Sequence, residues 1–311
     1  MRTHAAVAVE TADGFRALAD SGALSLPAAG RGETARRWAE LASFGERSLP
    51  IARLAEGHVA AAAILAERGD EIGPGTYWGV WAADPTSLKA APGPGEWRLT
   101  GDRQWCAGAH TCTDALVAAV GPDGPALFHV RTEDPRVQPV ADTWPATGMA
   151  ASDSGTVEFS DAPARLIGPL ADHLASPGYW HATMGVAAVW LGGARGVARV
   201  LTRLSAPDQH QLAHIGAVDE LLATGAAVLD GAARWVDANP AADAEQVARR
   251  VRAAVERVAA EVAERVGRAT GAGPLCADVE HGMRVADLHV YLRESLAERD
   301  LARLGELARG F

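Results

Sequence analysis

The chain has 311 residues, of which 48% are hydrophobic, and its formal net charge at pH 7 is −10. At roughly 150 residues per domain, this length predicts about two domains with sizeable buried cores. The acidic balance argues against a large basic surface, so nucleic acid is not an expected partner. Three cysteines are too few for a disulfide framework. No apolar run reaches the ~18 residues of a membrane helix, and acidic residues occupy the place of a signal peptide's apolar segment, so we expect a cytoplasmic protein that does not bind membranes.

The first 75 residues are predicted to be helical, in Ala-rich segments at residues 11–21, 33–44 and 51–69. In the third segment, apolar residues and one His recur at three- and four-residue spacing, which indicates one buried stripe: Leu54, His58, Ala61, Ala62 and Leu65. From residue 76 to 168 the pattern changes to short runs rich in β-branched and aromatic residues, separated by Gly, Pro and Asp. Their close spacing favours an antiparallel barrel or sandwich. The expected strands are residues 77–83, 97–99, 103–107, 115–120, 126–130, 136–139 and 155–159.

Residues 169–311 are predicted to form a helical bundle. Val251, Val255, Val258, Val262 and Val266 follow one another at spacings of four, three, four and four residues, with Arg and Glu on the other faces. Helices are expected at residues 179–204, 212–239, 242–270 and 278–308. The sequence therefore predicts an α+β protein in three segments: helices at 1–75, a β domain at 76–168 and a bundle at 169–311.

Two local clusters have simple structural explanations. Cys106, His110 and Cys112 could bind zinc, but a fourth ligand and a Cys-x-x-Cys pair are missing, so we expect no metal site. The run from Gly192 to Gly196 lies inside a predicted helix and follows no strand, which favours close helix packing over a phosphate-binding loop. Common hydrolase and NTPase motifs are missing from the sequence. The histidines of the helical half that could act as a general base are His210, His214, His281 and His289.

Strings along nearly the whole chain resemble motifs of the acyl-CoA dehydrogenase family of flavoproteins. Residues 97–109, WRLTGDRQWCAGA, resemble the strand and turn that lead to a Trp beside the flavin. Residues 80–85, VWAADP, fall where the family has a Thr-Glu-Pro turn, and residues 147–159 resemble its Gly-Met-Arg-x-Thr-x-Ser segment. In the helical half, residues 187–196 resemble the first long bundle helix, residues 270–273 a Gly-rich turn, and residues 284–287 the Arg-Asp-Ala segment before the catalytic region.

This resemblance implies an acyl-CoA dehydrogenase-like fold with a shortened N-terminal helical part. It also implies FAD, with its ring system between the β domain and the bundle, and subunits that pair through their bundles. The family's flavin-contacting Thr side chains fall on Ala83 and Ala107, so contacts there would use backbone groups. The cofactor-binding residues implied are Ala82, Ala83, Trp105, Cys106, Ala107, Gly271 and Gly273.

Several positions depart from the family pattern. The Arg-x-x-Phe-Gly segment that helps hold the adenosine end of FAD is missing between Arg203 and Gln209, and Gly267 stands where the family has a Gln. The catalytic Glu that abstracts the α proton falls on Arg293, whose guanidinium cannot act as a base. Glu294 is the nearby carboxylate that we nominate, although one residue turns a helix by about 100°.

The resulting hypothesis is an FAD-dependent oxidoreductase that acts on the CH–CH group of an acyl thioester or a related small molecule. One alternative is a non-catalytic or half-site subunit that pairs with a paralogous acyl-CoA dehydrogenase. Another is a flavin-dependent monooxygenase or oxidase that lacks the catalytic Glu. A flavin-free protein that binds acyl groups is less supported. Depending on which of these hypotheses is correct, we expect a homodimer, a homotetramer or a heteromer.

Overall fold

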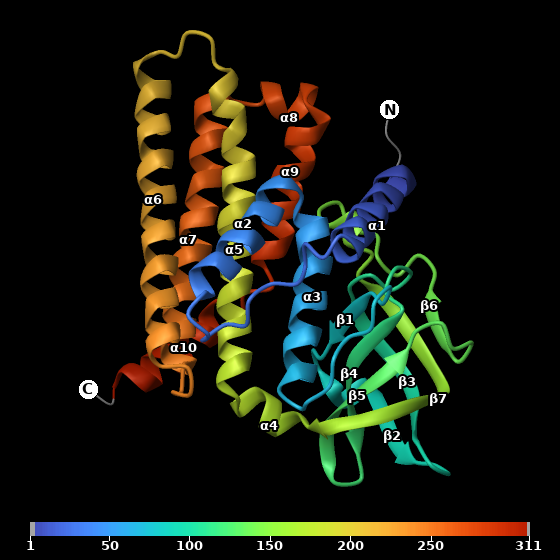
Figure 1. Ribbon diagram of the computed structural model, residues 1–311. Helices are drawn as coiled ribbons and strands as arrows, with labels where there is room; N and C mark the ends of the chain where they lie inside the picture. The colour runs from blue at the N-terminus through green and yellow to red at the C-terminus, as the bar shows by residue number, and fades with distance from the viewer. Residues whose placement is uncertain (1–3, 310–311) are drawn as a thin grey trace. The chain divides into compact units, whose positions relative to one another are not determined.

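The computed structural model describes residues 4–309, and Figure 1 shows their helices and strands. Contacts along the chain divide it into two compact units. The first unit contains Met1–Ser25, Arg53–Ala146 and Ala150–Tyr179. The second contains Leu26–Ala52, Thr147–Met149 and Trp180–Phe311. Each unit is therefore assembled from separate stretches of the sequence.

The first unit is built around a small closed barrel. Among the described residues, its strands are β1 (Trp78–Trp81), β2 (Leu88–Pro92), β3 (Trp97–Cys106), β4 (Asp114–Gly121), β5 (Gly124–Arg131), β6 (Val137–Val140) and β7 (Gly155–Pro169). They pair in the order β1-β4-β2-β3-β7-β5. Because β5 also pairs with β4, the strands β4, β2, β3, β7 and β5 close into a ring, and β6 joins the ring along β7.

The expectation of a purely antiparallel sheet is wrong at two pairings. β1 runs parallel to β4, from the pair Trp78 and Asp114 to the pair Trp81 and Val117. β2 also meets β4 in parallel, through Lys89 and Val120. Parallel strands need a long connection that brings the chain back in the same direction. The hairpin of β2 and β3 provides this connection between β1 and β4, so the sheet is mixed.

Several strand boundaries differ from the prediction. β2 was not predicted, because Leu88–Pro92 contains Lys, Ala and Pro and no β-branched residue. The strands expected at 97–99 and 103–107 form one strand, β3, which continues through Gly101. β7 continues past residue 159 to Pro169, although Asp161 and Pro163 interrupt its apolar alternation.

Two apolar clusters stabilise this unit. Phe128, Val157 and Phe159 lie in the cluster that fills the barrel. On the outside, Ala61, Ile64 and Leu65 of α3 (Leu49–Ala66) pack against Trp78, Leu116 and Leu127. The sheet therefore buries both faces where α3 lies beside it (Figure 1). Helices α1 (His4–Asp20) and α4 (Leu170–Ala175) complete the unit.

The second unit is helical. Its elements are α2 (Thr34–Arg47), α5 (Pro177–Ala198, which begins in the first unit), the 3₁₀ helix η3 (Arg199–Arg203), α6 (Gln209–Ala238), α7 (Glu245–Thr270), α8 (Gly273–Ala277), α9 (Val279–Leu292) and α10 (Glu298–Ala308). The five valines of the predicted stripe on α7 are buried, which confirms that prediction. The single helix expected at 278–308 is wrong, because α9 and α10 are separated by a turn in which Ala297 has φ 35°.

Glycines of α5 allow very close contact with α2, as the sequence predicts. A Cβ atom added to Gly192 would lie 2.0 Å from the carbonyl oxygen of Ala42. One added to Gly196 would lie 2.8 Å from the carbonyl oxygen of Glu46. Since both oxygens belong to the backbone of α2, neither can rotate away. The run from Gly192 to Gly196 is thus a helix contact.

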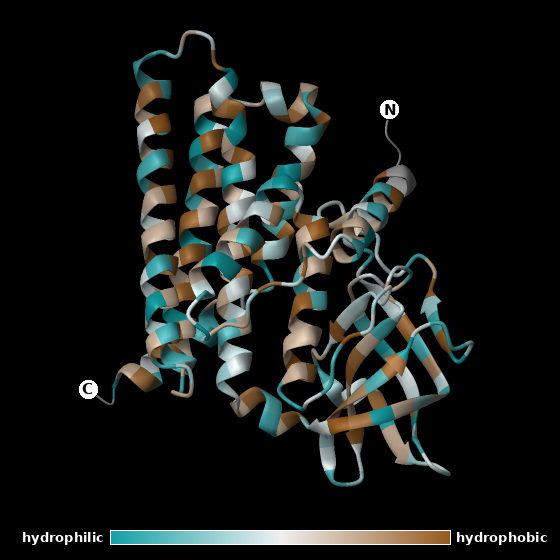
Figure 2. Ribbon diagram, viewed as in Figure 1, coloured by the Kyte–Doolittle hydropathy of each residue, from teal (hydrophilic) through white to brown (hydrophobic). Residues whose placement is uncertain are grey.

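Three helical segments of the described chain are long and apolar enough to cross a membrane, judged by length and composition alone: α3, Pro177–Arg203 (α5 with η3) and α6. The expectation that no segment reaches this threshold is therefore wrong. In α3 and in Pro177–Arg203, 61% and 78% of the apolar window is buried in the fold, against 17% in α6. Figure 2 shows hydrophilic residues interspersed with hydrophobic ones along α6.

Candidate functional site

The ends of β1 and β3 form an edge of the barrel at which the implied cofactor-binding residues of the first unit come together. The indole Nε1–H of Trp81 donates a hydrogen bond of 3.0 Å to the carbonyl oxygen of Ala107. The guanidinium of Arg103 donates to the carbonyl oxygens of Asp84 and Ala118. These bonds hold the turn after β1 beside the end of β3. We call the set Ala82, Ala83, Trp105, Cys106 and Ala107 the β1–β3 edge.

A β-bulge turns Trp105 outward on this edge. Along β3, alternate residues such as Leu99 and Arg103 are buried, and regular alternation would also bury Trp105. The pairing with β7 shifts between Arg103 and Cys106, and Trp105 has φ 64°, a left-handed conformation. As a result Trp105 is 61% exposed, and Cys106 takes the buried position.

A second tryptophan, which the sequence analysis did not single out, contacts Trp105. The ring of Trp144 meets it edge to face, with centroids 5.7 Å apart and planes at 85°. Trp144 follows Thr143, whose hydroxyl donates to the carbonyl oxygen of Val140 and accepts the N–H of Thr156. The segment between β6 and β7 is therefore fixed at this point, and the two rings form one aromatic surface.

The chemistry of the β1–β3 edge fits a flat heteroaromatic ligand such as a flavin. The Cys106 side chain is fully buried, and burial raises the pKa of its thiol, so the thiol does not present a thiolate to a ligand. Ala82, Ala83 and Ala107 have no polar side-chain atoms. Contacts to a ligand would come from the Trp105 ring and from backbone N–H and C=O groups, which match a ring system with an aromatic face and a polar rim.

The cysteine and histidine cluster beside this edge is split between the interior and the surface. Burial raises the pKa of the Cys112 thiol to about 12, and Cys106 is also inside the barrel. The His110 side chain is exposed, with Nδ1 3.1 Å from the carboxylate of Asp153, which also accepts the His110 backbone N–H at 2.7 Å. The described residues contain no group of three or more His, Cys, Asp or Glu able to hold a metal ion.

The remaining implied cofactor residues, Gly271 and Gly273, lie in the helical unit. Gly271 ends α7 with φ 64°, and its N–H donates to the carbonyl oxygen of Gly267. Gly273 begins α8, and both glycines are exposed. Where the family carries its adenosine-binding segment, this chain has a short turn, and Asp208 caps α6 by accepting two backbone N–H groups.

Arg293 and Glu294 lie at the end of α9 instead of inside a continuous helix. Arg293 forms an ion pair of 3.1 Å with Glu256 of α7, although its side chain is 67% exposed. Glu294 lies in the turn before α10 and is also exposed, and its N–H donates to the carbonyl oxygen of Tyr291. A general base that works near neutral pH benefits from a dry environment. Neither residue has one within the second unit.

The histidines of the helical half are scattered over different elements. His210 and His289 are exposed, and His214 is half-buried on α6. His281 is buried at the start of α9, and burial lowers its pKa. None of these positions by itself identifies a general base.

Asp287 is a buried carboxyl whose role the sequence did not show. It is 8% exposed on α9, and its Oδ1 accepts the backbone N–H of Met149 at 2.6 Å. Met149 has φ 56°, and a Cβ on Gly148 would lie 2.1 Å from the carbonyl oxygen of Ala286. Burial raises the pKa of Asp287 to about 6. This carboxyl therefore anchors residues 147–149 to α9.

No family model and no curated protein matches this sequence. Solved structures match over almost its full length. KijD3, solved in complex with FMN and a dTDP-linked amino-keto sugar, has a TM-score of 0.80 and 19% identity, covering 96% of this chain and 86% of that one. TdsC from Paenibacillus sp. A11-2, solved with FMN and indole, has a TM-score of 0.76 and 20% identity, covering 96% and 95%.

A third match is the HsaA monooxygenase from M. tuberculosis, with a TM-score of 0.74 and 15% identity over the whole of both chains. The chain has the acyl-CoA dehydrogenase-like fold. This confirms the predicted fold class, apart from the two parallel strand pairings. At these identities the matches establish the fold alone, and the site residues stay predictions.

Proposed function

We propose that this protein is a flavin-dependent monooxygenase. The proposal rests on which residues occupy the position where dehydrogenases of this fold have their catalytic base. Arg293 stands there with an exposed side chain paired with Glu256, and Glu294 is exposed in the turn that follows. Because this position has no buried carboxylate to take an α proton, thioester dehydrogenation is not supported, whereas monooxygenation needs no such base. Similarity to the HsaA monooxygenase, and to TdsC, a dibenzothiophene monooxygenase, supports this choice.

We propose FMN as the flavin in place of the FAD implied by the sequence resemblance. The turn between η3 and α6 is short, and Asp208 is engaged as a helix cap, so this segment has no Arg or Phe to hold an adenosine group. FMN lacks that group. The structures of TdsC and KijD3 contain FMN, which supports the choice.

Reduced FMN, when bound, would supply two electrons to O₂, so that one oxygen atom enters the substrate and the other leaves as water. The protein's own part begins with the aromatic surface of Trp105 and Trp144, which would cover one side of the flavin ring and keep water from it. Trp81 and Arg103 hold the backbone of the β1–β3 edge in place. That backbone would orient the polar rim of the ring.

Replacing Trp105 by Ala is expected to weaken FMN binding by about fivefold or more, because base or ring stacking on an exposed aromatic contributes about 1–3 kcal/mol. FMN affinity can be measured by the quenching of flavin fluorescence. Trp235→Ala changes a half-buried Trp of α6 and is the matched control. If both variants bind FMN as the wild type does, the β1–β3 edge is not the flavin site.

Monooxygenation itself is tested with chemically reduced FMN, ¹⁸O₂ and indole as the probe substrate. We expect ¹⁸O in the product of the wild type, and no bleaching of oxidised flavin by acyl-CoA in the wild type or in Glu294→Gln. Bleaching by acyl-CoA that is lost in Glu294→Gln would instead establish the dehydrogenase hypothesis. A colourless protein that purifies with a paralogous flavoprotein would favour the partner-subunit alternative.

A further inference from the structure

A pocket of about 580 Å³ opens on the barrel where β7 changes partners. One edge of β7 pairs with β6 as far as Phe159 and with β5 from Arg165 onward. The pocket lies at the interval between these two pairings. Its lining residues come from the loop before β3 and from β3, β5, the loop after β5, and β7: Gly95, Glu96, Trp97, His129, Arg131, Asp134, Pro163, Ala164, Arg165 and Leu166.

One wall of this pocket carries three nitrogen-bearing side chains on the outer face of the sheet. His129 and Arg131 alternate along β5 with Phe128 and Val130, which point into the barrel. Arg165 of β7 is the direct register partner of His129. The three side chains therefore lie next to one another on two paired strands.

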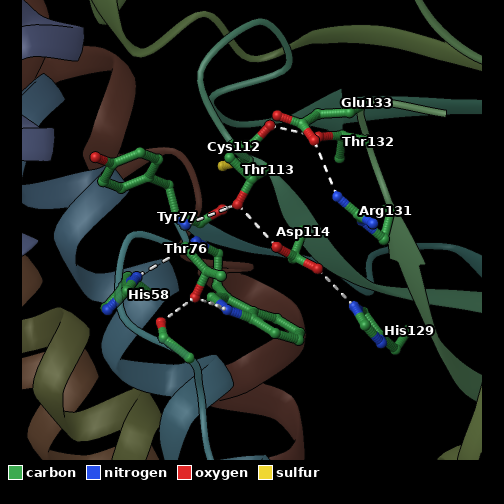
Figure 3. A network of polar contacts seen from close by, with 12 residues as sticks. His58, Thr76, Tyr77, Cys112, Thr113, Asp114, His129, Arg131, Thr132 and Glu133 are labelled. Carbon is green, nitrogen blue, oxygen red and sulfur yellow. Dashed lines mark hydrogen bonds and ion pairs between the residues drawn. The ribbon is translucent and has the colours of Figure 1, made fainter. Parts of the chain in front are cut away.

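The imidazole of His129 is held in one orientation. Its Nε2 lies 2.8 Å from Oδ1 of Asp114, and the hydroxyl of Thr113 donates to Oδ2 of the same carboxylate at 2.8 Å, as Figure 3 shows. The ring of Trp78 stacks on the imidazole at 4.6 Å. With Nε2–H donated to Asp114, the other nitrogen, Nδ1, is left for a ligand.

The acidic residues of the pocket are already neutralised by other arginines. Arg136 binds Asp134 through two hydrogen bonds and holds the pKa of that carboxyl down to about 2. Arg98 forms an ion pair of 2.8 Å with Glu96. These pairs limit repulsion of an incoming anion.

Arg131 and Arg165, in contrast, are paired at the surface. Arg131 contacts Glu133, and these side chains are 73% and 64% exposed. Arg165 contacts Asp70, with 53% and 43% exposure. Such exposed ion pairs contribute little free energy and exchange partners easily, so both guanidinium groups can turn to a ligand.

We propose that this pocket binds a small organic anion whose carboxylate or phosphate is held by Arg131 and Arg165. A planar ring of the ligand would lie against Trp97, and a hydroxyl or N–H group would donate to His129 Nδ1. This site is separate from the β1–β3 edge, since Trp97 and Trp105 lie at opposite ends of β3, about 25 Å apart at ~3.3 Å per residue. The proposal does not depend on flavin binding.

The test is calorimetric titration of the full-length protein with phenyl phosphate, benzoate and inorganic phosphate. We expect one of the two ring-bearing anions to bind, and the tighter one identifies the anionic group. Arg131→Gln and Arg165→Gln should each weaken binding about tenfold or more, as removal of hydrogen bonds to a charged group does. Arg36→Gln, which removes an equally exposed arginine paired with Glu33, should leave it unchanged.

Binding that is equal in all three variants, or no binding of either ring-bearing anion at 10 mM, would overturn the proposal. Inorganic phosphate that binds as tightly as phenyl phosphate would reject the ring subsite at Trp97. FMN titrations separate this site from the proposed function, because Arg131→Gln and Arg165→Gln should bind FMN normally. Thermal melting of each variant shows whether it has folded.

Discussion

Replacing Gly192 by Ala is expected to lower the free energy of unfolding by about 2 kcal/mol or more. The new methyl group would lie 2.0 Å from the carbonyl oxygen and 2.8 Å from the carbonyl carbon of Ala42, so α2 and α5 would have to move apart. Inserting a methyl group into a well-packed core typically costs about 1–3 kcal/mol, and here both neighbours are backbone atoms. Urea unfolding followed by circular dichroism measures the effect.

Gly216→Ala is the matched control for this prediction. Gly216 also lies inside a long helix, α6, but a Cβ there meets no atom within 4 Å. Alanine should therefore stabilise the protein by up to about 1 kcal/mol through its higher helix propensity. If Gly192→Ala behaves like Gly216→Ala, α2 and α5 do not pack as described.

The second large effect concerns Asp287. Burial raises its pKa from 3.8 to about 6, so the folded protein favours the protonated carboxyl. The resulting stability is fully present below about pH 4 and is lost as the pH rises towards 6, a change of about 3 kcal/mol. Asn keeps an oxygen acceptor for the Met149 N–H and carries no charge. Asp287→Asn should therefore unfold at higher urea than the wild type at pH 7.5.

Near pH 4 the two proteins should differ little, because the wild-type carboxyl is then protonated in the folded state. Asp219→Asn, at an exposed position of α6, controls for the general effect of removing one negative charge. If the stability difference between wild type and Asp287→Asn is the same at pH 4 and pH 7.5, Asp287 does not titrate as a buried group.

Periodicity predicted those parts of the fold that depend on local spacing. The valine stripe of α7 and the small-residue contact of α5 were both visible, because a helix places residues three and four apart on one face. The break between α9 and α10 was not visible in the sequence, because the charged residues from Arg293 to Asp300 keep helical spacing across it. The parallel pairing of β1 with β4 depends on strands far apart in sequence, about which a local pattern says nothing.

The candidate sites show the same limit. A motif resemblance named Trp105, but the bulge that exposes it depends on its pairing with β7. Predicting that Trp144 contacts Trp105 would have required knowing which loop lies beside β3. The pocket at His129 joins residues from three separate stretches, and neither His129 nor Arg165 belongs to any motif. Such sites become visible only when strand register is known.

The helical unit combines α2, from near the N-terminus, with helices from the second half of the chain, and this affects how it folds during synthesis. Asp237 of α6 accepts the N–H groups of Gly32 and Thr34 and the Thr34 hydroxyl, across more than 200 residues of sequence. At about 5–20 residues per second, a ribosome completes α2 roughly 10–40 s before α6. Until α5 is made, which takes most of that time, the apolar face of α2, with Trp38 and Phe44, lacks the helices that bury it. We therefore expect the nascent chain to need protection by a chaperone, and fragments that end before α5 to aggregate.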